Sequence, residues 1–244
     1  MRRIEAHVFV EDLEAPRLVP EDHHHLARVL RLAEGALVSA SDGVGGVRLC
    51  RFQARQEELV PAGEPSFVPE PKLSVTVAVG LLKGDSMALA VQKLTELGVD
   101  RIILLDCERS QLHWRPGPET AARLGRLERI AREASMQSRR CRLPKLTGPV
   151  KLSELASREQ VVLADRGGSE LEDVPSVVAI GPEGGWSDSE RGLGLPTITL
   201  SDTVLRAETA ALAAATLLCA LRRRAESSWQ AGGTVRRDAC SVFE

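Results

Sequence analysis

The spacing of apolar residues changes near residue 70, so the chain reads as two parts. In the first part, short apolar runs between turn residues predict a β-rich unit over residues 1–68. Its expected elements are a strand over 6–10, a short helix over 21–32 that faces inward through His25, Val29 and Leu32, and a hairpin over 36–52. Four prolines between residues 61 and 71 then predict an extended linker.

From Lys72 onward strands alternate with helices, which is typical of an α/β domain with a mostly parallel sheet. The expected strands cover residues 73–82, 101–105, 161–164, 177–180 and 198–200. The expected helices cover residues 86–97, with Gly98 as the carboxyl-terminal cap, 119–138 and 207–223. We expect the tail from Glu226 to be loosely ordered, because it is polar, contains glycine and lacks periodicity.

Composition narrows the class of protein. The 244 residues can form one or two domains, and a net charge of −2 provides no global basic field for nucleic acid. Aromatic residues make up only 3% of the chain, which argues against a base-stacking platform. The amino terminus lacks the apolar region of a secretory signal, and the longest apolar run, residues 210–221, is too short for a membrane span. Five scattered cysteines favour a reducing cytoplasm and provide no metal or disulfide framework.

A glycine-rich turn follows the apolar strand 177–180, with the sequence Gly181-Pro182-Glu183-Gly184-Gly185. Glycine permits left-handed backbone and close approach to a ligand, proline stiffens the turn, and Glu183 adds a carboxylate. Such a loop is typical of a small-molecule site. The alternative is a plain strand-to-helix turn capped by Ser187 or Asp188.

A second turn, over residues 200–210, leads into a helix rich in alanine and leucine. The guanidinium of Arg206 can bind a phosphate or a carboxylate through two hydrogen bonds. Glu208 falls in the first turn of the helix, where the helix dipole stabilises a negative charge. Alternatively, Arg206 and Glu208 pair with each other or cap the helix. The helix itself is apolar on every side, so it either fills the core or meets another subunit.

Two basic segments are candidates for phosphate contact in this slightly acidic protein. Residues 129–145 carry six basic side chains, including Arg139 and Arg140, against one acid. In residues 23–31, Arg28 and Arg31 share one helix face, whereas the adjacent histidines point in different directions and do not form a metal site. The alternative for both segments is an ordinary solvated helix face.

At these residues the chain closely resembles the RsmE family, the 16S ribosomal RNA uridine N3-methyltransferases of the SPOUT class. The resemblance extends to about Arg224 and rests on six motifs in order: His24–Arg31, Gln92–Gly98, Glu108–Ser110, Glu133–Arg140 with Pro144, Gly181–Gly185, and Leu205–Ala210. The family usually has a glycine after the leucine that is Leu200 here, whereas this chain continues with Ser201-Asp202-Thr203. We expect that change to alter how the backbone wraps the cofactor.

The resemblance implies a PUA-like RNA-binding β-barrel over residues 1–68, a SPOUT methyltransferase domain over 72–225 and a flexible tail over 226–244. The SPOUT domain would hold a trefoil knot in its parallel sheet, with helices on both faces. The resemblance also implies S-adenosyl-L-methionine as the methyl donor, a cytoplasmic homodimer, no metal, and 16S ribosomal RNA in the small subunit as the substrate, modified near the decoding centre.

Roles for individual residues follow from this resemblance. The cofactor would be held by Gly181, Pro182, Glu183, Gly184, Gly185, Leu200, Val204 and Leu205. Arg206 would stabilise negative charge on the uracil ring or hold the target phosphate, and Glu208 or Glu183 would orient Arg206 or accept the proton. The RNA backbone would be held by Arg28, Arg31, Arg139 and Arg140. The competing functions are a SPOUT enzyme that modifies another RNA base or transfer RNA, and a non-catalytic RNA-binding assembly factor.

Overall fold

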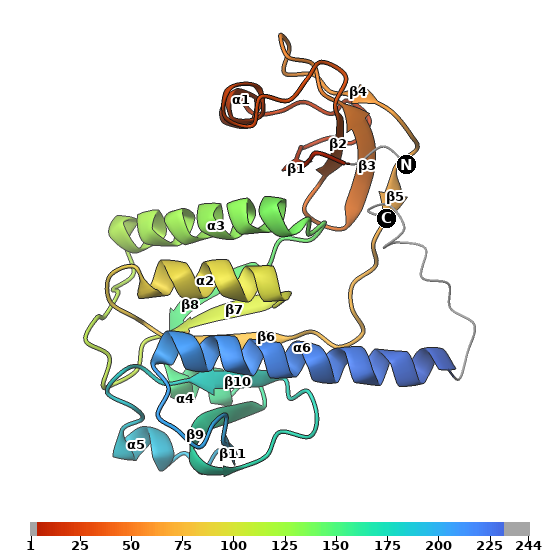
Figure 1. Cartoon of the computed structure of the whole chain (residues 1–244). Coiled ribbons are helices and arrows are strands. Elements are labelled where there is room, and N and C mark those ends of the chain that lie inside the picture. Colours follow the sequence, from red (N-terminus) through yellow and green to blue (C-terminus); the bar gives the residue numbers. More distant parts are fainter. Residues whose placement is uncertain (1–3, 232–244) are drawn as a thin grey trace. The chain divides into compact units, whose positions relative to one another are not determined.

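The structure is a computed structural model that describes residues 4–231 (Figure 1). These residues form two compact units. Within the described residues, the N-terminal unit consists of residues 4–71 together with Ser135–Leu143, and the C-terminal unit consists of Lys72–Ala134 and residues 144–231. The sequence did not predict that residues 135–143 return to the N-terminal unit.

The N-terminal unit is built on a five-stranded sheet, in which β5 pairs with β3 beside the order β1-β2-β3-β4. The strands are β1 (Ala6–Phe9), β2 (Leu37–Ser41), β3 (Gly46–Arg51), β4 (Val60–Pro61) and β5 (Ser66–Phe67). The predicted hairpin is confirmed, since β2 and β3 are antiparallel and joined by residues 42–45. Asp42 fixes that turn, because its Oδ1 accepts hydrogen bonds from the backbone N–H groups of Val44 (2.8 Å) and Gly46 (2.9 Å).

The predicted helix over 21–32 is present as α1 (Pro20–His24) continued by the π-helix η1 (His25–Val29). The predicted inward face is wrong at two of its three positions: His25 is exposed and Val29 is 62% exposed, whereas Leu32 packs against the core and the buried residue of the helix is Leu26. The Leu30 N–H bonds to the His25 carbonyl five residues earlier, so this turn contains an extra residue and the 3.6-residue period fails. Part of the predicted linker is also paired, since Ser66 and Phe67 bond to β3.

Hydrogen bonds to its backbone groups hold the returning segment, residues 135–143, against the rest of the N-terminal unit. Ser41 Oγ donates to the Cys141 carbonyl (2.9 Å), and the Leu143 N–H donates to the Gly43 carbonyl (2.9 Å). His7, only 3% exposed, bonds through Nε2 to the Arg140 carbonyl (3.0 Å) and through Nδ1 to Ser39 Oγ (2.8 Å). Since a carbonyl can only accept, Nε2 carries a proton in this bond.

The C-terminal unit is built on a six-stranded parallel sheet with the order β11-β9-β10-β6-β7-β8. Its strands are β6 (Thr76–Gly80), β7 (Arg101–Leu105), β8 (Lys145–Val150), β9 (Val161–Ser169), β10 (Val177–Ile180) and β11 (Thr197–Ile198). Its helices are α2 (Ser86–Leu97), α3 (Pro118–Ser138), α4 (Leu152–Ala156), α5 (Asp188–Arg191) and α6 (Ala207–Ala231). The prediction of an α/β unit with a parallel sheet is confirmed.

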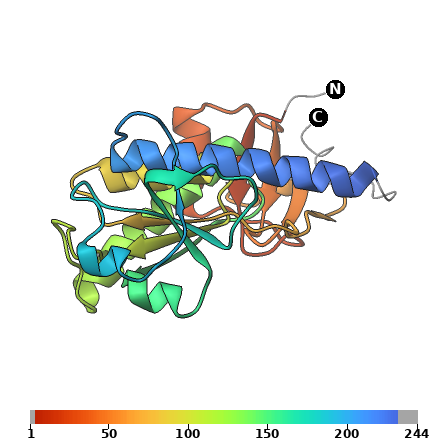
Figure 2. The same ribbon diagram turned by 90° about the horizontal axis from the view of Figure 1, so that it is seen from below.

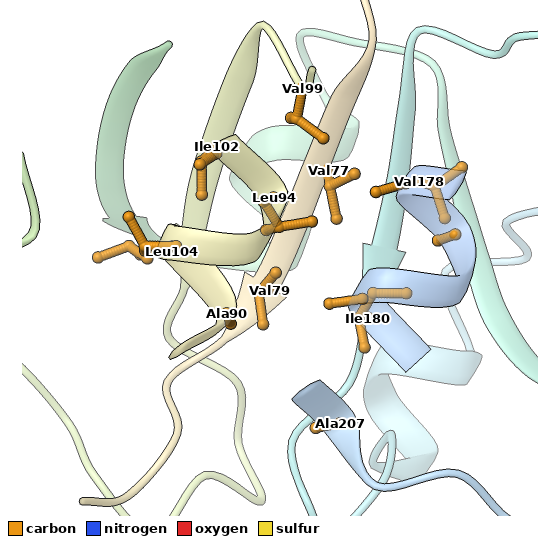
Figure 3. Packing of buried hydrophobic residues seen from close by; sticks show 14 of the residues in the cluster. Val77, Val79, Ala90, Leu94, Val99, Ile102, Leu104, Val178, Ile180 and Ala207 are labelled. Carbon is orange, nitrogen blue, oxygen red and sulfur yellow. The ribbon is translucent and has the colours of Figure 1, made fainter. Parts of the chain in front are cut away.

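Alternate residues of the central strands face two separate cores. Val77, Val79 and Ile180 face one side, where they pack with residues of α2, α3 and α6. Figure 3 shows Ala90 and Leu94 of α2 over this side of the strands, and Figures 1 and 2 show α6 running alongside the sheet. The intervening residues face the other side and pack with α4 and Trp186. Burial on both faces explains the nearly continuous apolar runs of these strands.

Three elements of this unit, β8, α4 and α5, were not among the expected elements, because each is short and its apolar period is too brief to recognise. The alanine-rich helix α6 fills the core with Ala211, Ala214 and Leu218 on one side. It continues to Ala231 rather than ending near residue 223, since no glycine or proline interrupts it before Gly232. The rest of the predicted tail, 232–244, lies outside the described residues, and the knot remains a prediction.

Within residues 4–231, no helix combines the length and apolarity needed to cross a membrane.

The buried His7 predicts a pH dependence of stability. Burial lowers the pKa of His7 to about 4, and the nearby charge of Arg139 acts in the same direction, while the hydrogen bond to Arg140 opposes it. Between about pH 6.5 and pH 4 the unfolded chain therefore binds a proton that the folded chain excludes. We expect the free energy of unfolding to fall by about 3 kcal/mol as pH decreases through this window.

Urea titrations across this pH range would measure the effect. The His7→Asn variant should lose most of the decrease, whereas His24→Asn, at an exposed position, should retain it. Equal pH dependence in wild type and His7→Asn would contradict the assignment.

Candidate functional site

A pocket of about 420 Å³ lies in the C-terminal unit where β10 and β11 pass into loops, beside the middle of β9. In a parallel sheet these carboxyl ends meet at one edge, which is where ligands of open α/β sheets usually bind. The lining residues are Ala164, Asp165, Arg166, Ile180, Gly181, Pro182, Glu183, Gly185, Trp186, Thr199, Leu200, Ser201, Thr203, Val204, Leu205, Arg206, Ala207 and Ala210.

The glycine-rich turn after β10 forms the first wall. The Gly185 N–H donates to the Pro182 carbonyl (2.8 Å), and Gly185 has a φ of 68°, the left-handed region that favours glycine. A Cβ on Gly80, at the end of β6, would stand 2.8 Å from Pro182 N, so the turn needs the absence of a side chain there. The alternative of a capped turn also holds, because Ser187 caps α5. The segment therefore lines a pocket and also leads into the cap of α5.

Gly184 alone among the five residues of this turn does not line the pocket. A Cβ at Gly184 would stand 2.8 Å from the Arg109 carbonyl oxygen and 3.1 Å from Arg109 Cβ. The predicted cofactor-binding position therefore packs closely against the turn that follows β7.

The segment between β11 and α6 forms the second wall. Leu200, Val204 and Leu205, all predicted to contact the cofactor, line the pocket. The Thr203 N–H donates to Ser201 Oγ (3.1 Å), which closes a hydroxyl-based turn where the family usually has glycine. Val204 is 74% exposed at the edge of the pocket. An exposed valine beside a pocket leaves apolar surface that a ligand or a second protein can cover.

The predicted catalytic residues lie at the start of α6. Arg206 lines the pocket, and its carbonyl accepts the Ala210 N–H (2.8 Å), so it stands at the helix amino terminus. In residues 4–231, no ion pair joins Arg206 to Glu208, and the guanidinium of Arg206 has no hydrogen-bond partner. Glu208 is half-buried in the first turn of α6 and is not part of the pocket lining.

The third wall, from β9 and Trp186, was missed by sequence reasoning. Trp186 is 1% exposed and donates from Nε1 to the Ala164 carbonyl (3.0 Å). Asp165 Oδ1 accepts the Arg166 N–H (2.9 Å), and Asp165 Oδ2 accepts a hydrogen bond from Arg191 Nε (2.9 Å). The available signal was the change from apolar to charged residues after Ala164 in a predicted parallel strand.

Charges and apolar groups are both present in the pocket. Asp165 and Glu183 supply carboxylates and Arg166 and Arg206 supply guanidinium groups, while aliphatic side chains cover much of the remaining wall. The hydrogen bond to Asp165 raises the pKa of Arg191, whose charge helps to hold that carboxylate in place. Such a pocket suits a zwitterionic or cationic ligand that also has an apolar ring.

The four predicted RNA-binding arginines all belong to the N-terminal unit. Arg28 and Arg31 are both exposed, but Arg31 lies beyond the end of η1 at Val29, so the predicted shared helix face is wrong. Arg139 and Arg140 are half-buried in residues 135–143. Arg139 Nη2 donates to the Ile4 carbonyl (2.9 Å), so part of its guanidinium is used within the unit. Among the described residues, Arg31 and Arg139 are the two non-glycine residues with left-handed backbone, at φ values of 52° and 57°.

Comparisons with known proteins identify both units. An RNA methyltransferase domain model matches residues 69–219, and an RNA methyltransferase PUA domain model matches residues 20–60. A ribosomal RNA small subunit methyltransferase E from Synechocystis sp. is 32% identical over 210 residues, which cover 77% of this chain and 67% of that protein. A protein of the same name from Mycobacterium bovis is 29% identical over 236 residues, covering 85% and 87% of the two chains.

Among solved structures, a methyltransferase from Legionella pneumophila in complex with the cofactor SAM superposes with a TM-score of 0.75. It is 28% identical, and the match covers 90% of this chain and 98% of that one. The fold is therefore that of the SPOUT methyltransferases with a PUA-like N-terminal domain. Together with the matched domain model, these similarities show that the chain belongs to the RsmE family of RNA methyltransferases.

Proposed function

We propose that this protein is an S-adenosylmethionine-dependent methyltransferase that modifies N3 of a uridine in 16S ribosomal RNA, near the decoding centre of the small subunit. The observation that carries the proposal is the pocket itself, in which the glycine-rich turn and Arg206 line one cavity in a chain of this family. A ribosomal RNA substrate implies that the enzyme acts in the cytoplasm.

The residues of the pocket fit S-adenosylmethionine. When bound, this cofactor supplies an electrophilic methyl group on a positively charged sulfonium. The aliphatic side chains of Ile180, Leu200 and Leu205 suit its adenine ring, and the open space beside Gly185 leaves room for close approach to the backbone. The carboxylates of Asp165 and Glu183 suit the positive charges of the cofactor, and Arg166 suits its carboxylate.

The chemistry required at the uracil ring assigns a role to Arg206. The N3–H group is a weak acid that is protonated at neutral pH, so its proton must leave as the new bond forms. Negative charge then spreads over the ring, and an unpaired guanidinium in the pocket is placed to stabilise it. Between the two carboxylates suggested by the sequence, Glu183 lines the pocket and is the better proton acceptor, while Glu208 stays at the start of α6.

N3 lies on the base-pairing edge, so the target uridine must be unpaired or turned out of its helix. The protein must therefore hold the flanking RNA firmly. The exposed guanidinium groups of Arg28 and Arg31 suit this task, because phosphate contact is independent of sequence and only orients the strand. Arg140, in the segment fastened by His7, completes the basic surface of the N-terminal unit that we assign to RNA.

A homodimer is part of the proposal. The side of α6 that does not enter the core carries apolar residues that remain half-exposed, among them Leu212, Ala213 and Leu217. A second copy packed on this side would remove them from water and would also cover Val204, at the edge of the pocket.

Nucleoside analysis tests the proposed reaction. Ribosomal RNA from a strain that lacks this protein should have lost 3-methyluridine from the small subunit, and the purified protein with S-adenosylmethionine should restore it. Mass spectrometry of digested RNA measures both results. Loss of a different modified nucleoside, or of none, would contradict the proposal.

Substitution of Arg206 tests its role. Arg206→Ala should lower kcat by about 10²- to 10³-fold, as expected when one group that stabilises developing charge is removed. Binding of S-adenosylmethionine, measured by calorimetry, should remain because the backbone of the pocket is unchanged. Wild-type turnover in this variant would remove Arg206 from the chemistry.

The RNA contacts are tested by salt dependence. The double variant Arg28→Ala/Arg31→Ala should weaken RNA binding and reduce the slope of log Kd against log salt by roughly 1.4 to 1.8, because two phosphate contacts are lost. Arg17→Ala is the matched control, since Arg17 already pairs with Glu57 and Glu58. An unchanged slope in the double variant would mean that these arginines do not touch phosphates.

A further inference from the structure

We propose that Glu190 and Arg191, on the one-turn helix α5, are positioning residues that hold the glycine-rich turn in the shape that binds S-adenosylmethionine. The ligand rests on the proposed function, whereas the positioning role rests on hydrogen bonds within the C-terminal unit. Neither residue lines the pocket. Their effect must therefore pass through the groups to which they bond.

Glu190 connects two segments that are far apart in sequence. The carboxylate belongs to a residue that is only 6% exposed, and each oxygen accepts a backbone N–H. Oε2 accepts from Ser187 (2.8 Å), where the chain leaves the glycine-rich turn, and Oε1 accepts from Glu108 (3.1 Å), in the turn after β7. A buried carboxylate with two backbone donors fixes both segments strongly, because such charge-assisted bonds are stronger than neutral ones.

The turn after β7 supports the pocket wall from behind. Arg109 follows Glu108, and its carbonyl oxygen lies within 2.8 Å of the position that a Cβ on Gly184 would occupy. The Ser110 N–H donates to the Cys107 carbonyl (3.0 Å), which closes this turn. In this proposal the Glu108-Arg109-Ser110 motif forms the surface that Gly184 packs against. Glu190 keeps the motif in position through its bond to the Glu108 N–H.

Arg191 likewise connects two segments through hydrogen bonds. Its Nη1 donates to the Trp186 carbonyl (2.8 Å) and its Nε donates to Asp165 Oδ2 (2.9 Å). Trp186 directly follows the glycine-rich turn and Asp165 belongs to β9, so one guanidinium joins the end of that turn to β9. A lysine cannot make both bonds with this geometry, because its donors radiate from a single atom.

The length of α5 supports a positioning role rather than a structural one. A four-residue helix has little stability of its own and buries only a small surface. The bonds made by Glu190 and Arg191 instead converge on residues 186 and 187, directly after the turn that lines the pocket. Small displacements of such a turn change affinity strongly, because its backbone must approach the ligand closely.

Calorimetry with S-adenosylmethionine on the full-length protein tests the inference. Glu190→Gln puts an amide NH₂ against one of the two N–H donors, and Arg191→Lys loses the two-point contact. We expect each variant to bind the cofactor about tenfold more weakly and to raise its KM similarly, while the Kd for RNA is unchanged. Glu154→Gln is the control, since Glu154, on α4, forms an exposed ion pair with Arg158.

A glycine substitution provides a test that removes no hydrogen bond. Gly184→Ala places a methyl group against the Arg109 carbonyl and must shift the turn, so cofactor affinity should fall as in Glu190→Gln. A purely structural role would lower Tm but leave the affinity of the folded protein unchanged. Because Arg191 is exposed, Arg191→Lys folds even where Glu190→Gln does not.

The outcomes separate the two proposals. If wild type binds no S-adenosylmethionine, the proposed function fails and the ligand assignment of this inference fails with it. If wild type binds but Arg191→Lys and Gly184→Ala bind equally well, the positioning role is overturned while the proposed function stands. Equal weakening in Glu154→Gln would also overturn it, since the effect would then not be specific to α5.

Discussion

The parallel pairing of β9, β10 and β11 is the constraint on which the site depends. β10 pairs with β9 in regular register up to Ile180 and Ala164, and β11 pairs with β9 through a register shift, so the residues that follow Ala164, Ile180 and Ile198 line one pocket. Three segments separated by up to forty residues in sequence thereby become the walls of one pocket. The apolar contacts on both faces of the sheet keep these strands fixed, and the loops can then carry polar chemistry without supporting the fold.

Close backbone contact is the second requirement of the site. Gly80 lets Pro182 approach the end of β6, and Gly184 lets the turn rest on Arg109. These contacts leave no space for a side chain, so the position of the turn is determined by neighbours rather than by its own sequence. Glu190 and Arg191 add directional bonds to this steric fit, which gives the turn one conformation instead of several.

The N-terminal unit brings together segments that are far apart in the sequence. Residues 135–143 return to this unit after much of the C-terminal unit has been built, and His7 and Ser41 bind their carbonyl groups. Arg139 and Arg140 thus join the unit that also carries Arg28 and Arg31. Burial and the nearby charge of Arg139 lower the pKa of His7 and so favour the neutral ring at this position.

The sequence by itself determined the elements with a long apolar period or a strong turn signal: β7, β10, α2 with its Gly98 cap, and the hairpin β2–β3. It also marked the glycine-rich turn and Arg206, because glycine, proline and charged residues beside a buried strand carry a local signature. Only the tertiary structure decided that Asp165 and Trp186 complete the pocket, that Gly184 faces Arg109, and that residues 135–143 join the N-terminal unit. These contacts depend on strand order and on hydrogen bonds between segments that are far apart in the sequence. A local sequence pattern does not indicate which distant residues will become neighbours in the fold.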